Sequence, residues 1–295
     1  MNNKIIVFLA AFGLSAALAS ASTSSSLSKF SFKLTGGLSY QGQSDANANL
    51  VDNVMALWSD YVKLGVFSGF TGELKPLHWG PDASAEIVYQ VKPGIGIALG
   101  IGYLSTHKSK DDNWIADGEI SRSFDDAVSA VPVTLAICYS RPLSGFFGLS
   151  AEAGLGIYFA KWTETNASQF VSLPHYPTSY TLKVNGAGFG IHGTIAMDVA
   201  IVRPVFLVIE ATGRYAKIGN LTGNTVYTRS NGTSTTTEGK LYYYERLNGT
   251  TEKSYPQVYL YTEEEAKTNK NLLNLRDAKV DVSGFSLRAG ILVRL

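Results

Sequence analysis

Residues 131–159 read VPVTLAICYSRPLSGFFGLSAEAGLGIYF and contain two alternating runs joined by a short turn. In 131–139 and in 147–159, apolar side chains occupy every second position, and polar or small residues fill most positions between them. Because successive side chains of a β-strand point to opposite faces, each run predicts a strand with one apolar and one polar face. The turn between them contains Pro142 and Gly145, so the pair is predicted to be an antiparallel hairpin.

The same alternation recurs along the chain and predicts eight strands. They cover residues 30–40, 83–91, 97–103, 131–139, 147–159, 189–199, 205–215 and 285–295. Short turns follow the second, fourth and sixth strands, whereas long loops follow the first, third, fifth and seventh, at about 41–81, 105–129, 161–185 and 219–280. This alternation of connection lengths is typical of transmembrane barrels and not of soluble sandwiches. We therefore expect an all-β fold: an eight-stranded antiparallel transmembrane up-and-down β-barrel with long extracellular loops.

The first 21 residues have the features of a secretory signal peptide. Lys4 supplies a positive charge, residues 5–19 are apolar, and Ala19-Ser20-Ala21 matches an A-x-A cleavage site. The alternative is an uncleaved membrane anchor, but that would need about 20 apolar residues. We predict cleavage after Ala21 and a mature barrel over residues 22–295.

Composition argues against several classes of function. The chain has 25 basic and 24 acidic residues, so no basic field for a nucleic acid is expected. Cys138 is its single cysteine and cannot form an intramolecular disulfide or a Cys-based metal site. We expect no metal and no cofactor. His107 beside Ser105 is the nearest approach to a catalytic pair, and we expect the protein not to be an enzyme; a lipid-modifying outer-membrane enzyme is the less favoured alternative.

These eight runs resemble the small eight-stranded outer-membrane barrels of the OmpA/OmpX-like and OmpW-like kind, often grouped as porin-family β-barrel domains. The resemblance covers the mature chain. The final strand, Val282 to Leu295, resembles the C-terminal signal that the barrel assembly machinery reads, although Leu295 stands where such signals usually have Phe. The resemblance implies an integral protein of a Gram-negative outer membrane, in contact with outer-membrane lipids and lipopolysaccharide.

Charged residues fall on the inward face of the predicted barrel, near mid-height. Eight strands enclose a space just wide enough for side chains or one small ligand, so a general porin is not expected. Buried charges cost several kcal/mol each unless they are paired, so we predict a salt-bridge network. Such a network would be either the gate of a narrow pore or structural packing. Its predicted members are Lys33, Glu86, Glu152, Glu210, Arg214 and Arg288.

Small residues on the third, fifth and sixth strands predict a recess in the extracellular half of the barrel. The OmpW-like resemblance implies the passage of small hydrophobic solutes through such a recess. The alternatives are that a loop folds into the space or that glycine relieves crowding in a tightly curved barrel. The candidate ligand-binding residues are Leu104, Tyr158, His192, Gly154 and Gly190.

The long loops contain local structure of their own. Apolar residues at three-to-four spacing over residues 50–64 predict a helix that ends at Gly65 and either plugs the recess or lies at the outer interface. Residues 241–261 predict a hairpin, and Thr262 with Glu265 predicts a helix capping box. From the sequence we expect a structural or surface-contact role, with a surface partner, or a narrow gated pore.

Overall fold

The computed structural model describes residues 29–295 except 67, 112–113, 117–119, 171–176 and 270–271. The predicted signal peptide, residues 1–21, lies outside the described residues. None of the helices described has both the length and the apolar character needed to cross a membrane.

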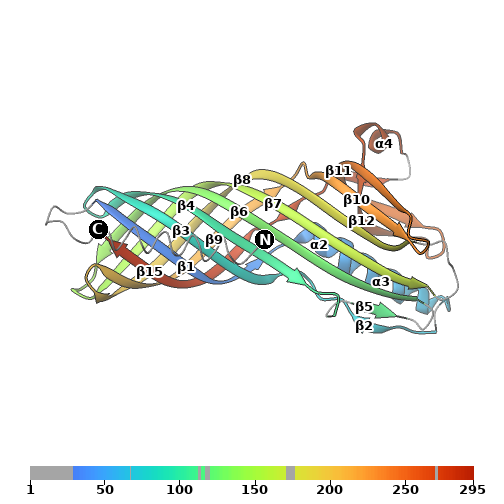
Figure 1. Ribbon diagram of the computed structural model, residues 1–295, viewed down its shortest axis with the longest axis horizontal. Helices are drawn as coiled ribbons and strands as arrows, with labels where there is room; N and C mark the ends of the chain where they lie inside the picture. Colours follow the sequence, from blue (N-terminus) through green and yellow to red (C-terminus); the bar gives the residue numbers. More distant parts are fainter. Residues whose placement is uncertain (1–28, 67, 112–113, 117–119, 171–176, 270–271) are drawn as a thin grey trace.

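The described residues form a closed ring of eight antiparallel strands (Figure 1), which confirms the predicted fold. Each strand pairs with its neighbour along the chain, and β1 pairs with β15 from Ser31 opposite Arg294 to Gln41 opposite Gly284. The ring consists of β1 (Phe30–Gln41), β3 (Trp79–Lys92), β4 (Ile95–Lys108), β6 (Ile120–Pro142), β7 (Phe147–Phe170), β8 (Pro177–Val202), β9 (Val205–Ile218) and β15 (Gly284–Arg294).

The outer surface of the ring is an apolar belt. Leu135, Ile137, Leu155 and Phe189 are 58%, 67%, 66% and 81% exposed, while the residues between them point inward. In water, so large a contiguous apolar surface would be an aggregation liability, whereas in a bilayer it contacts lipid chains. Closure of the ring pairs the edge strands, so no open sheet edge faces the lipid.

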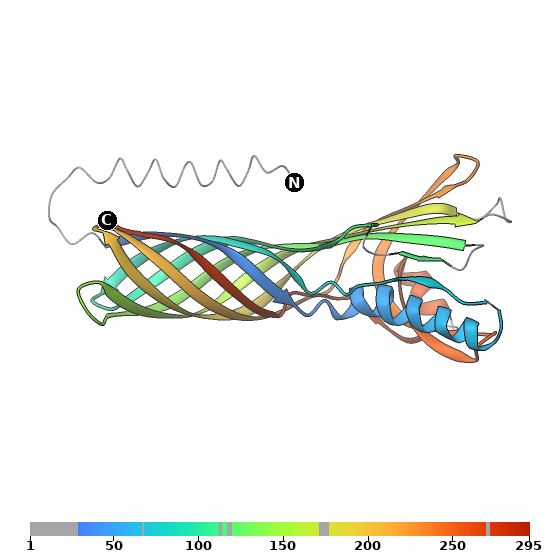
Figure 2. The ribbon, with the colours of Figure 1, turned by 90° about the horizontal axis from the view of Figure 1, so that it is seen from below.

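Three of the strands described are much longer than a membrane requires. β6, β7 and β8 contain 23, 24 and 26 residues, whereas about 9–11 residues suffice to cross a bilayer. Their outer ends continue into a folded region, here called the head, which comprises the described parts of residues 42–78, 105–129, 161–185 and 219–283. Figure 2 shows the head at the end of the molecule opposite the C-terminus.

The head also contains shorter elements. It includes a continuous helical segment formed by α2 (Ser44–Asn47), the π-helix η1 (Ala48–Asn53) and α3 (Val54–Lys63). The remaining elements are β2 (Thr71–Glu73), β5 (Trp114–Ala116), β10 (Thr222–Arg229), β11 (Ser234–Asn248), β12 (Lys253–Tyr261), α4 (Glu263–Thr268), β13 (Leu273–Asp277) and β14 (Val280–Asp281).

Two of the predicted loops need correction. Residues 105–129 and 161–185 are predicted from the sequence to be loops, but β6, β7 and β8 run through much of both. Beyond the membrane a strand does not need one wholly apolar face, so Asp126 and Glu164 can lie inward beside Phe124 and Trp162. In these two segments the simple apolar alternation of a membrane strand is absent, so the sequence pattern predicts loops instead of strands.

The local predictions for the loops are confirmed. The helix forms and is followed by Gly65 with a positive φ of 71°. The hairpin is β11–β12, and Thr262 with Glu265 forms the capping box at the start of α4. Within the helical segment, Leu50 and Trp58 pack in a core of the head that includes Phe124, whereas Ala46 belongs to the buried cluster that contains Leu104 and Tyr158.

Candidate functional site

Lys33 is the centre of a charge cluster at mid-height in the barrel. Its Nζ lies 2.8 Å from a carboxylate oxygen of Glu86, 2.8 Å from one of Glu152 and 3.0 Å from one of Glu210. Lys33 is on β1 and Glu152 is on β7, and four steps separate these strands in either direction around the ring. The Lys33–Glu152 ion pair therefore spans the full width of the lumen.

Asp82 on β3 is a second centre. Its carboxylate accepts hydrogen bonds from Arg288 Nη1 at 3.1 Å and from Arg214 Nη1 at 3.3 Å, and it also accepts one from the hydroxyl of Ser286. Arg288 joins the two centres, because its Nε lies 2.7 Å from Glu210 Oε1. The structure thus brings all six predicted charged residues into one network, although Arg214 enters it through Asp82.

Sequence reasoning missed Asp82. A signal was present, since position 82 is two residues before Ser84 and four before Glu86, and so lies on the same inward face. Pro81 was taken as the end of a loop, but it lies within β3. Asp82 is 3% exposed, so the network includes a buried carboxylate that two guanidinium groups share.

Hydroxyl groups complete the network. Thr35 donates a hydrogen bond to Glu210 at 2.8 Å, and Arg288 Nη2 donates one to Thr212 at 2.8 Å. Among the described residues, three cationic side chains of the network face four carboxylates. The charges of the network are thus paired and hydrogen-bonded across the lumen, which offsets the cost of burying them.

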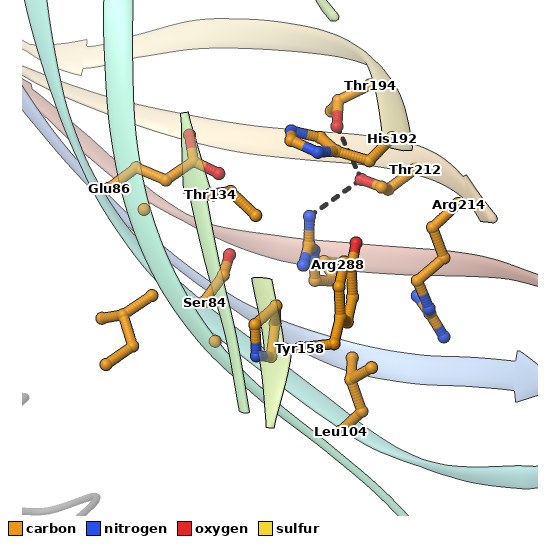
Figure 3. Close-up of a pocket in the computed structure, with 14 residues that line it drawn as sticks. Ser84, Glu86, Leu104, Thr134, Tyr158, His192, Thr194, Thr212, Arg214 and Arg288 are labelled. Carbon is orange, nitrogen blue, oxygen red and sulfur yellow. Dashed lines mark hydrogen bonds between the residues drawn. The ribbon is translucent and has the colours of Figure 1, made fainter. Parts of the chain in front are cut away.

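A cavity of about 40 Å³ lies beside this network (Figure 3). Leu104, Tyr158 and His192 line it, as predicted for the recess, together with Arg214 and Arg288. A water molecule needs roughly 10–15 Å³ of such space, so the cavity holds about three. It is too small for a hydrophobic solute.

Gly154 and Gly190 do not open the recess further. A Cβ at Gly190 would lie 2.7 Å from Tyr158 Cε2, and one at Gly154 would lie 2.7 Å from His192 Cε1. Atoms of neighbouring strands lie nearer still, with Ala136 Cβ at 2.6 Å from the Gly154 position and Ala216 Cβ at 2.5 Å from the Gly190 position, so the rings and these strands together occupy the space. The glycines relieve crowding, which was one of the alternatives left open by the sequence.

No protein-family model matches the chain, and neither does any curated protein. Similar solved structures include Neisserial surface protein A, at 9% identity and a TM-score of 0.40, covering 91% of this chain and 98% of that one. They also include outer membrane protein OprG from Pseudomonas aeruginosa, at 10% identity and a TM-score of 0.38, with 90% and 96% covered. At these values the likeness assigns no residue and no role.

The architecture decides the class without those comparisons. A closed strand ring, an apolar belt around it and a charged interior together satisfy the requirements for crossing a bilayer with strands. The chain has the architecture of a membrane-spanning β-barrel. Of the remaining histidines, His107 Nε2 lies 3.1 Å from Asp125 on the exposed head surface, and His78 Nδ1 lies 2.9 Å from the backbone oxygen of Gln41. His175 lies outside the described residues.

The crowding around Tyr158 gives a testable prediction. Gly190→Ala is expected to lower the free energy of unfolding of the barrel by about 1–3 kcal/mol, because the new Cβ overlaps the Tyr158 ring and Ala216. Gly193→Ala is the matched control on β8, since its Cβ would meet only the Glu152 backbone oxygen at 3.6 Å. Urea unfolding in lipid vesicles measures both, and equal effects would contradict the filled recess.

Proposed function

We propose that this outer-membrane barrel is a closed, non-enzymatic anchor that holds the head at the cell surface for contact with other molecules. One observation supports the proposal most strongly: an ion pair crosses the lumen at mid-height, while β6, β7 and β8 continue into a folded head. A pore would need the lumen, whereas an anchor needs only the outer belt and the head.

The head is held together by polar contacts of two buried carboxylates as well as by apolar packing. Asp60 on α3 accepts hydrogen bonds from Lys253 Nζ at 2.9 Å and from Tyr255 at 2.8 Å, which fixes the helix to β12. Arg276 on β13 forms a bidentate pair with Asp45 on α2 at 2.7 and 2.8 Å. Bidentate pairs fix orientation, so these contacts favour a head of defined shape.

Shortening the head tests the surface-contact role. In a headless variant, residues 42–78, 106–126, 163–183 and 222–281 are replaced by short turns, which shortens β4, β6, β7 and β8 but keeps the part of each strand that lies in the barrel. Cells with the intact protein are expected to adhere to neighbouring cells or to immobilised surface glycoproteins more strongly than cells with the headless variant. Heat-modifiability on a gel checks that both barrels are folded. Equal adhesion of the two strains would contradict the proposal.

A narrow gated pore is the second candidate. The observation in its favour is that charged and hydroxyl side chains, and not apolar ones, fill the lumen at mid-height. In that case Arg288→Ala should alter the single-channel conductance of the folded protein. Passage of hydrophobic solutes has less support, because the cavity beside Tyr158 is small and has Arg214 and Arg288 in its wall.

A further inference from the structure

The head contains a pocket of about 210 Å³ between the helical segment and the inner faces of the surrounding strands. Asn49, Asn53 and Val54 line it on the helical side, and residues of β6, β7, β8, β10, β11 and β12 line it on the others. For comparison, a cavity of about 150 Å³ is large enough to take up benzene. The pocket is separate from the cavity beside Tyr158 and is large enough for a small organic molecule.

Four tyrosines form one wall of this pocket. Tyr180 stacks on Tyr227 with 5.9 Å between ring centroids, and Tyr227 lies 6.4 Å from Tyr259. Tyr244 completes the wall and donates a hydrogen bond to Gln257. Several aromatic faces around one space attract cations, and organic ammonium groups are the usual guests of such sites.

An acidic pair lies at the inner end of the pocket. Glu164 lines the pocket, and Asp126 is its direct partner in the β6–β7 pairing; each is 1% exposed. Asn49 donates a hydrogen bond to Glu164 at 3.0 Å, whereas both carboxylate oxygens of Asp126 are buried without a hydrogen-bond partner among the described residues. Two neighbouring buried carboxyl groups favour a positive charge beside them.

Arg122 supplies the opposite charge. It lies on the inward face of β6 four residues before Asp126, which corresponds to roughly 13 Å along the strand. Its Nε is buried and has no hydrogen-bond partner in the part of the chain that the structure describes, and no ion pair of Arg122 occurs there either. A half-buried arginine whose Nε lacks a hydrogen-bond partner favours an anionic group beside it.

We propose that this pocket binds a small zwitterion, with its ammonium group among the tyrosine rings near Glu164 and its anionic group against Arg122. The proposal rests on the head being the functional part of the protein, as proposed above. The two ends of the pocket have opposite charges, and the aromatic wall lies between them. A ligand with only one charge would leave one of the two ends unpaired.

Calorimetry of the purified protein in a maltoside detergent tests the proposal. The probes are γ-butyrobetaine, which has both charges, tetramethylammonium, which has only the positive one, and butyrate, which has only the negative one. We expect γ-butyrobetaine to bind at least about tenfold more tightly than either single-charge probe. Equal affinities, or no binding of γ-butyrobetaine at millimolar concentration, would overturn the proposal. Because adhesion is not measured, failure here is distinguishable from failure of the surface-contact role.

Two variants separate the two ends of the pocket. Glu164→Gln keeps a hydrogen-bond partner for Asn49. It should weaken the binding of γ-butyrobetaine and of tetramethylammonium about tenfold without affecting the binding of butyrate. Arg122→Gln should weaken the binding of γ-butyrobetaine and of butyrate without affecting the binding of tetramethylammonium. The controls are Glu238→Gln and Arg229→Gln, which change exposed residues of β11 and β10 that do not line the pocket. Equal losses in variants and controls would contradict the assignment.

The affinity should also depend on pH. Burial raises the pKa of Glu164 to about 7, although the hydrogen bond from Asn49 lowers it, and burial also raises the pKa of Asp126 well above its usual range. An ammonium group prefers the ionised carboxylate, so its binding releases a proton. The affinity of γ-butyrobetaine should therefore rise between pH 6 and pH 8, and Glu164→Gln should abolish this rise. The other titratable or charged groups that line the pocket are Arg122, Tyr180, Tyr227, Tyr244 and Tyr259.

Vesicles of phosphatidylcholine are a further probe, because each headgroup, like γ-butyrobetaine, has one positive and one negative charge. We expect no competition between these vesicles and γ-butyrobetaine, since the pocket lies in the head and not in the lipid belt. Binding to vesicles without binding to the free solute would assign the pocket to a lipid surface and would contradict a solute site.

Discussion

Lys33→Met is expected to lower the free energy of unfolding of the barrel by about 3–5 kcal/mol. Lys33 is 5% exposed and is in contact with three carboxylates at 2.8 to 3.0 Å. Without it, Glu86 and Glu152 lose the cation that each contacts, and Glu210 retains only Arg288. Removing one partner from a buried ion network leaves an uncompensated buried charge, and this strongly lowers the free energy of unfolding.

The measurement is urea unfolding of the refolded protein in lipid vesicles, followed by tryptophan fluorescence. Lys29→Met is the matched control, because Lys29 precedes the same strand and is exposed. Adding Glu152→Gln to Lys33→Met should recover part of the loss, since it removes one of the unpaired carboxylates. A Lys33→Met protein as stable as the control would show that the network contributes nothing to stability.

Asp82→Asn is expected to lower the free energy of unfolding by about 2–4 kcal/mol. Asp82 is the carboxylate that pairs with Arg214 among the described residues, and it also accepts a hydrogen bond from Arg288. Asparagine keeps the volume but removes the charge, so Arg214 becomes a buried cation without a counter-charge. Arg288 is affected less, because it keeps Glu210.

The same unfolding experiment measures this second effect. Asp125→Asn provides the control, because Asp125 is exposed on the head and, among the residues that the structure describes, its ion pair is with the exposed His107. A loss in Asp82→Asn no larger than in the control would mean that Arg214 is satisfied by Ser286 and by the backbone oxygen of Val282 alone.

The barrel could be predicted from sequence because lipid imposes a strict pattern on it. Every strand in the membrane must place apolar side chains outward, so alternation in 147–159 or 189–199 fixes both the strand and its inward face. The inward charges follow from the same alternation. Asp82 was missed because the predicted second strand began at residue 83, one residue after Asp82, whereas β3 already includes Pro81 and Asp82.

The head and the filled recess could not be predicted in the same way. Outside the bilayer a strand can have Glu164 and Trp162 on one face, so periodicity no longer separates strand from loop. The glycines at 154 and 190 indicated missing volume, but the sequence does not say that the rings of Tyr158 and His192 turn into it. The tyrosine pocket was missed because its wall combines β8, β10, β11 and β12, which are distant in sequence.

Single-channel recording in planar bilayers tests the central claim, a lumen closed by side chains, most directly. The refolded protein is inserted after a heat-modifiability gel has shown that it is folded, and a general porin is recorded in parallel as a positive control. The ion pair between Lys33 and Glu152 across the lumen predicts a silent barrel at voltages where the porin conducts. Discrete openings of reproducible size from the folded protein would contradict a closed lumen and would favour the gated pore.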